Sequence, residues 1–147
     1  MVGCNSCFNG NAGSHVVLFG NVQQCSCMNN GNYGILSDNN GFATILNNNC
    51  SFNGQTNFSG SVTHGAGIYI TNSPGCRVEG NTFDFNYIGV LVATNYNALI
   101  IRNSANDNTT AYLLNPGNSW GPLVNVSGAG DISGTANANN PQANFIH

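Results

Sequence analysis

The stretch Asn81–Val92 reads "NTFDFNYIGVLV". Asn81 and Asn86 flank the apolar residue Phe83, and Gly89 opens a short apolar segment. The same spacing of two asparagines around a small or apolar residue recurs at Asn48–Asn53 and at Asn103–Asn108. The stretch is therefore one unit of a repeat, and internal repeats decide the fold class before any single element does.

The residue in the Phe83 position marks the register of the repeat. Cys4, Cys27 and Cys50 are spaced by 23 residues, Phe83 follows 33 residues later and Ala105 another 22 residues later. Several other columns agree with this register. Three residues after the marker lie Cys7, Asn30, Asn53, Asn86 and Asn108, and two residues before it lie Cys25, Asn48, Asn81 and Asn103. Apolar residues recur at Val22, Ile45, Val78 and Ile100 and, each after a glycine, at Ile35, Ile68 and Val90.

Each unit contains three short apolar segments with the two-residue period of a β-strand. Asparagine and glycine, which tolerate left-handed backbone, separate these segments. Asparagine makes up about a fifth of the chain, and glycine contributes 19 of the 147 residues. We therefore predict an all-β, single-stranded parallel β-helix of about five to six coils of about 22–23 residues. Side chains of one column would stack as ladders, and asparagine amides can bond from coil to coil.

A leucine-rich repeat has a similar period but requires a dense leucine pattern that this chain lacks. The pattern V-x-x-N-x-F-x-x-N at Val78–Asn86 instead resembles the right-handed parallel β-helix repeats of pectate-lyase-like proteins. The resemblance covers Cys4–Leu114 and implies a right-handed coil. We expect the coils to occupy residues 1–114, with an insertion at 54–65. Residues 115–147 would form a last irregular coil and a tail that covers the end, with Phe145 as an apolar plug.

The resemblance implies catalytic equipment that this sequence does not contain. Lyases of that family need clustered carboxylates for calcium and a basic residue, hydrolases need two or three close aspartates, and epimerases carry an Asp-Pro-His cluster. Here there is no lysine, and the nearest acidic pair, Asp84 and Asp107, misses a shared column by one position. Alternation predicts that these two side chains point to opposite faces. We expect no catalytic residue and no cofactor, and we expect Glu79 and Arg102 to form a surface ion pair.

The six cysteines allow three interpretations. We expect Cys4, Cys27 and Cys50 to stack in one interior column as buried thiols. A disulfide between neighbouring coils is also compatible, because a strand spacing of about 4.8 Å lies within the Cα range of disulfides. The spacing "CNSC" at Cys4–Cys7 resembles half of a zinc site, although we predict no metal.

The candidate ligand-binding residues lie on the insertion and at aromatic positions that are expected to be exposed. A long loop on a regular scaffold is a common place for binding residues, and the insertion carries Phe58 and His64. Tyr69 would face outward from a strand, and Tyr87 and Tyr96 would lie in turns. Aromatic rings of this kind can stack on sugars.

Composition limits the partners. Charged residues make up 5% of the chain and the net charge is −3, so no basic surface for nucleic acid exists. No apolar run reaches the roughly 18 to 20 residues of a membrane helix. An uncapped solenoid end is an open β-edge. We therefore expect a non-catalytic structural protein that self-associates through its ends into a fibre or oligomer.

The expected location is extracellular or the cell surface, although no signal peptide is present in the chain. The alternative function is a carbohydrate-binding module or a fragment of a polysaccharide lyase or hydrolase. An ice-binding solenoid would need a consistent outward row of threonines, which the sequence does not show.

Overall fold

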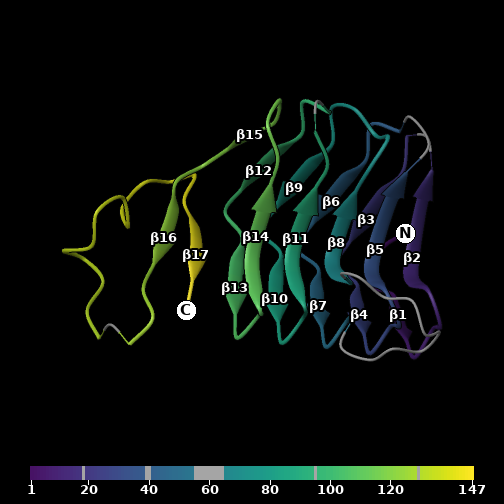
Figure 1. The fold of residues 1–147 in the computed structure, drawn as a ribbon, viewed down its shortest axis with the longest axis horizontal. Coiled ribbons are helices and arrows are strands. Elements are labelled where there is room, and N and C mark those ends of the chain that lie inside the picture. Colours follow the sequence, from purple (N-terminus) through teal and green to yellow (C-terminus); the bar gives the residue numbers. More distant parts are fainter. Residues whose placement is uncertain (18, 39–40, 55–64, 95, 129) are drawn as a thin grey trace.

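The computed structural model describes the chain except residues 18, 39–40, 55–64, 95 and 129. The described residues form an all-β solenoid of about six coils, without a helix. Three sheets of parallel strands run along the long axis, and most coils add one strand to each sheet (Figure 1). The predicted parallel β-solenoid is confirmed.

The regular coils add their strands to each sheet in chain order, and only the last two strands of sheet 1 are reversed. Sheet 1 contains, in order, β1 (Asn5–Cys7), β4 (Ser26–Met28), β7 (Asn49–Ser51), β10 (Thr82–Asp84), β13 (Ser104–Asn106), β17 (Asn144–Ile146) and β16 (Leu123–Asn125). Sheet 2 contains β2 (Ala12–Val17), β5 (Tyr33–Asp38), β8 (Ala66–Ile70), β11 (Ile88–Val92) and β14 (Thr110–Leu114). Sheet 3 contains β3 (Asn21–Gln23), β6 (Thr44–Leu46), β9 (Arg77–Glu79), β12 (Leu99–Ile101) and β15 (Ser119–Trp120).

The core consists of the apolar columns that the repeat predicted. Ile45, Val78 and Ile100 stand opposite one another in sheet 3 and are fully buried. The corresponding column of sheet 2 is Ile35, Ile68 and Val90, also fully buried. Burial of one such side chain contributes about 1.5–3 kcal/mol, so the stacked columns, repeated from coil to coil, provide the main driving force for the fold.

Two corners of each coil adopt the left-handed backbone conformation. One corner column contains Phe8, Asn29, Phe52, Phe85 and Asp107, and the other contains Gly3, Gln24, Asn47, Gly80 and Arg102. The non-glycine members have φ angles of 49° to 59°. The backbone N–H of Phe8, for example, donates to Met28 O, so hydrogen bonds to the next coil hold these corners in place.

The first coil differs from the prediction. Ser6, not Cys4, stands opposite Cys27, and Cys7 stands opposite Met28. The prediction that Cys4 belongs to the Cys27–Cys50 column is therefore wrong, and so is the alignment of Cys7 with Asn30. The first coil is two residues shorter than the 23-residue spacing implied, and the two cysteine pairs "CNSC" and "CSC" suggested a register that the backbone does not adopt.

The two ends of the solenoid are built differently. At the N-terminal end Val2 bridges Gln23 and Gly3 N donates to Gln23 O, so the first residues pair with the edge of β3. Within the described residues, β1 and β2 each pair with one strand only. At the C-terminal end β17 pairs with β13, and β16 pairs with β17. These two strands extend sheet 1 alone, whereas sheets 2 and 3 end at β14 and β15 (Figure 1).

Sheet 2 contains a column of glycines that ends one strand before β14. Gly34, Gly67 and Gly89 occupy equivalent positions, and a Cβ on any of them would lie 2.4–2.7 Å from the carbonyl oxygen of the next coil. Such a contact is far inside van der Waals distance, which explains why glycine is used. Ala111 occupies the position after Gly89. Its methyl group is accommodated because, among the described strands, none pairs with the outer edge of β14 in sheet 2.

Candidate functional site

The asparagine ladders lie at two turns of each coil. In the first ladder the backbone N–H and Nδ2 of each asparagine donate to Oδ1 of the asparagine in the next coil, at 2.9–3.1 Å. The rungs are Asn9, Asn30, Asn53, Asn86 and Asn108. The predicted asparagine hydrogen bonding is confirmed, and Asn9 occupies the rung assigned to Cys7 from sequence.

The second ladder repeats the same geometry at Asn48, Asn81 and Asn103 and continues to Asn144 of β17. Its first positions are held by cysteines: Cys4 N donates to Cys25 Sγ at 3.4 Å, and Cys25 N donates to Asn48 Oδ1 at 2.9 Å. Among the described residues, every buried side-chain nitrogen and oxygen atom has a hydrogen-bond partner. The ladders therefore give the buried side-chain amides of the turns hydrogen-bond partners within the chain.

Both ladders have a direction, because each asparagine before the last rung donates to the next asparagine toward the C-terminal end. Asn9 donates to Asn30 and receives no hydrogen bond on Oδ1 from the described residues. Asn108 ends the first ladder; its Nδ2 donates to Phe83 O and Asn106 O, and no further asparagine oxygen follows it in the described chain.

The six cysteines are free thiols. Cys27 and Cys50 stand opposite each other in sheet 1 with fully buried side chains. A hydrogen bond with the Cys27 thiol, together with burial, raises the pKa of Cys50 well above its ordinary value. Cys4 lies outside this column, and its Sγ donates to Val2 O. The part of the chain that the structure describes contains no group of three or more His, Cys, Asp or Glu side chains able to hold a metal.

One group of titratable side chains forms at the C-terminal end of sheet 1. Burial raises the pKa of Asp84, the charge of His147 lowers it and the charge of Asp107 raises it, so the three groups lie within electrostatic reach. Ser104 Oγ lies 2.6 Å from His147 Nε2. The prediction that Asp84 and Asp107 point to opposite faces did not anticipate an electrostatic interaction between them. Asp107 lies in a left-handed corner, where strand alternation no longer applies.

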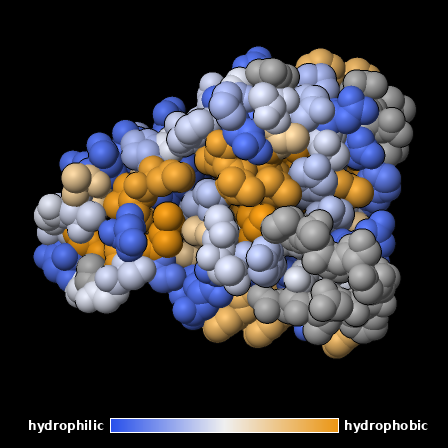
Figure 2. All heavy atoms as spheres, viewed as in Figure 1, coloured by the Kyte–Doolittle hydropathy of each residue, from blue (hydrophilic) through white to orange (hydrophobic). Residues whose placement is uncertain are grey.

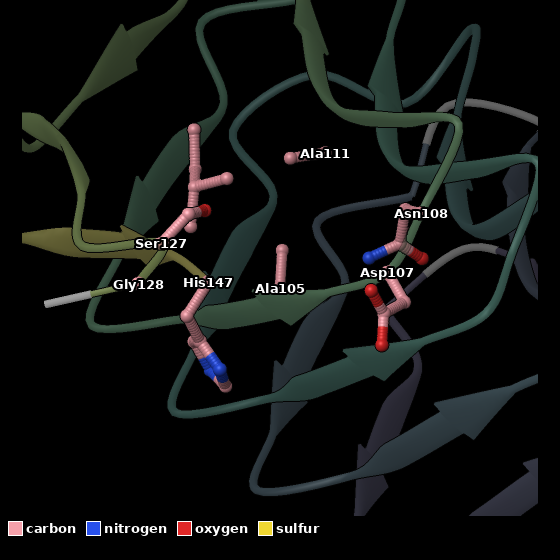
Figure 3. Close-up of a pocket in the computed structure, with 8 residues that line it drawn as sticks. Ala105, Asp107, Asn108, Ala111, Ser127, Gly128 and His147 are labelled. Atoms are coloured by element: carbon pink, nitrogen blue, oxygen red, sulfur yellow. The ribbon is translucent and has the colours of Figure 1, made fainter.

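A hollow of about 410 Å³ lies beside this group, between the last regular coil and the C-terminal strands. Figure 3 shows Asp107 and Asn108 on one side of it and His147 and Ser127 on the other, with Ala105 and Ala111 between them. The Tyr112 hydroxyl donates to Phe145 O across the same end. Phe145 is half-buried, so it contributes to the cover of this end without filling the hollow.

Aromatic side chains form three pairs between neighbouring coils. Phe52 and Phe85 stack at the corner of sheet 1, with centroids 5.0 Å apart and planes 8° apart, and both are about half exposed. Phe19 and Phe42 stack at another corner at 5.5 Å. Tyr69, predicted to face outward, is half-buried against Tyr33, with ring centroids 5.0 Å apart.

The other predicted ligand residues do not converge on one place. Tyr87 is exposed two residues after Phe85, and Tyr96 is half-buried in a different turn, before β12. Phe58 and His64, on the predicted insertion, lie outside the described residues. The predicted surface ion pair is present: Arg102 Nη1 lies 2.9 Å from Glu79 Oε1, and Arg77 Nε lies 2.7 Å from Glu79 Oε2.

Exposed apolar side chains are most prominent at the N-terminal end. Phe8 and Phe19 are 80% and 78% exposed, and Val2 and Met1 follow at 61% and 55%. We call these four side chains, with the outer edges of β1 and β2, the N-terminal end surface. Residues 1–37 contain no Asp, Glu, Lys or Arg. Elsewhere, Figure 2 shows apolar side chains over the β11–β14 region and over the C-terminal strands, where Leu113 and Leu123 are exposed.

No protein-family model, curated protein or solved structure matches the chain. Within the described residues, no helix is long and apolar enough to cross a membrane.

Proposed function

We propose that the chain is a non-catalytic structural β-solenoid that self-associates through its ends. The observation that supports this most strongly is the N-terminal end surface. There, β1 and β2 each pair on one side only within the described chain, and the most exposed large apolar side chains lie beside these open edges. Open strand edges pair readily with another chain, and an apolar surface of this kind marks an interaction site.

Charge supports the same proposal. The N-terminal coil carries no Asp, Glu, Lys or Arg side chain, so like-charge repulsion between two copies would be limited to the Met1 ammonium group, which donates to Asn21 O. The ladders support the role of a scaffold, because the buried side-chain amides of the turns find their hydrogen-bond partners within the chain. An extracellular or cell-surface location belongs to this proposal as the setting in which such a scaffold would assemble.

The test is the molar mass of the purified chain from light scattering and sedimentation between about 1 and 100 µM, a range set by the micromolar affinities of modest interfaces. Self-association predicts a mass above that of the 15.3 kDa monomer, rising with concentration. A constant monomer mass over the whole range would refute the proposal. Electron micrographs of the same samples distinguish closed oligomers from fibres.

A second candidate is polysaccharide binding at the Phe52–Phe85 stack. Two parallel, half-exposed rings with the exposed Tyr87 nearby offer apolar faces on which sugar rings can stack. The nearby Asp84, Asp107 and His147 are residue types used in glycoside hydrolysis. A glycan array tests binding, with Phe85→Ser as the variant that should lose it. Sugar release from polyuronates, compared between the natural chain and Asp84→Asn, tests cleavage.

A further inference from the structure

The geometry of the two ends points to one mode of assembly. We infer that two copies join by their N-terminal end surfaces around a two-fold axis, with the β2 strands paired antiparallel. This inference rests on the proposed self-association and specifies its partner and arrangement. It predicts a closed dimer in place of a head-to-tail fibre.

One feature of the first asparagine ladder favours head-to-tail stacking. The first ladder begins at Asn9 with an oxygen that accepts no hydrogen bond from the described residues. It ends at Asn108, whose Nδ2 already donates to Phe83 O and Asn106 O, but whose backbone N–H holds the position that donates to the next rung in the earlier coils. The Asn9 oxygen of one copy could thus receive a hydrogen bond from Asn108 of another. One such hydrogen bond stabilises head-to-tail stacking only if the rest of the C-terminal end can accommodate the second copy.

Two features of the C-terminal end block that fit. A second copy stacked on the last regular coil would have to place its β1 beside β13, but β17 already lies there. In sheet 2, the incoming β2 would have to bring a carbonyl oxygen against Ala111. At the equivalent glycines a Cβ would lie only 2.4–2.7 Å from that oxygen, so the Ala111 methyl occupies the required space. Neither obstacle can be relieved by rotating a side chain.

Parallel stacking would also mismatch the corners. Phe8 would follow Asp107 in its corner column, so an exposed phenyl ring would lie against a carboxylate. Stacking in this direction would therefore leave the apolar corner of the N-terminal end surface beside a charge.

The N-terminal end surface complements itself instead. Phe8 lies before β2 and Phe19 lies after it, at opposite ends of a strand of six residues, about 20 Å long at the usual rise. Antiparallel pairing of two β2 strands brings Phe8 of one copy to Phe19 of the other, twice, as a two-fold interface requires. Phe19 already stacks on Phe42 with one face, so the second copy would cover its other face. The open edge of β2 would gain strand hydrogen bonds in the same contact.

A charge exchange tests this arrangement. Phe8→Lys alone and Phe19→Glu alone should each weaken the dimer at least tenfold, since each places two charges against apolar rings. An equimolar mixture of the two variants should form a heterodimer, because Lys at position 8 then meets Glu at position 19 of the other copy. The double variant Phe8→Lys/Phe19→Glu should regain the homodimer. Within one copy these positions lie too far apart to pair.

The matched control is Trp120→Ser, which removes an exposed aromatic side chain from the C-terminal end and should leave the dimer unchanged. Circular dichroism of each variant checks that the fold is retained. A natural chain that stays monomeric would refute both this inference and the proposed function. A chain that assembles without sensitivity to Phe8→Lys or Phe19→Glu, or that grows into filaments, would refute the N-terminal dimer and leave self-association standing. Weakening by both single variants without rescue in the mixture would refute the antiparallel pairing.

Discussion

Replacement of Asn86 by Ala tests whether the ladder stabilises the solenoid. The Asn86 side chain is fully buried and makes four hydrogen bonds. Its Nδ2 donates to Cys50 O at 2.8 Å and to Asn108 Oδ1 at 3.0 Å. Its Oδ1 accepts from the backbone N–H and the Nδ2 of Asn53, at 3.0 and 2.9 Å. Alanine removes all four and leaves the buried N–H of Asn53 without its acceptor.

The magnitude follows from these contacts. A buried hydrogen bond contributes about 0.5–1.5 kcal/mol net, so four of them amount to about 2–6 kcal/mol, and the unsatisfied N–H places the value in the upper half. We expect the free energy of unfolding to fall by about 4 kcal/mol. Since whole domains have stabilities of about 5–15 kcal/mol, this loss should be visible in any unfolding experiment.

Urea unfolding followed by circular dichroism measures the change in the free energy of unfolding. Asn9→Ala serves as the control variant. Asn9 is exposed at the start of the ladder, donates to Asn30 and accepts nothing from the described residues. Its replacement should cost about 1 kcal/mol or less, as for an exposed hydrogen bond. If Asn86→Ala costs no more than Asn9→Ala, the ladder does not stabilise the interior of the solenoid and the reasoning is wrong.

Three further predictions concern charge and packing. Hydrogen bonding from Arg77 lowers the pKa of Glu79 below its ordinary value of 4.5. The stabilising contribution of the Glu79 carboxylate is therefore fully present above pH 4.5 and is lost as the pH falls through the lowered pKa. Glu79→Gln should flatten this acidic part of a plot of the free energy of unfolding against pH. Burial raises the pKa of Asp84 above 3.8, so its ionised form is disfavoured in the folded state, and Asp84→Asn should raise the melting temperature at pH 7 but not at pH 3. Gly89→Ala should destabilise the fold by about 1–3 kcal/mol, because the new Cβ would lie 2.4 Å from Ala111 O, whereas Ala111→Gly should be nearly neutral; equal costs for the two would contradict the packing argument.

The regular coils could be predicted from the sequence because three kinds of column repeat together. Asn48, Asn81 and Asn103 recur with apolar residues at fixed offsets, and each column is a physical requirement of stacking: a rung, a core side chain or a close backbone contact. The candidate end surface could not be predicted in the same way. Phe8 and Phe19 are ordinary apolar residues in the sequence, and their exposure follows from their positions beside β2, which pairs on one side only within the described residues.

The errors have identifiable causes. The sequence placed Cys4 in the column of Cys27, whereas Cys4 lies in the column of Cys25. The second coil has a cysteine in both columns, and only the backbone pairing of Ser6 with Cys27 decides between them. The order of the C-terminal strands, with β17 beside β13 and β16 outside it, escaped prediction because the chain leaves the repeat after Leu114 and returns to the ladder only at Asn144, 41 residues after Asn103. Asp107 was assigned a direction by strand alternation, although it lies in a left-handed corner.

The left-handed corners leave room to stabilise the solenoid further. In one corner column glycine is present at Gly3 and Gly80, while Gln24 and Asn47 adopt the same conformation with a side chain attached. A side chain in this region costs roughly 1–2 kcal/mol, which exceeds the roughly 0.5–1 kcal/mol that glycine loses in unfolded-state freedom. Both side chains are exposed at the surface. Glycine at these two positions should therefore produce a more heat-resistant solenoid with the same coils, and natural variation in this column would adjust thermal tolerance without altering either end of the molecule.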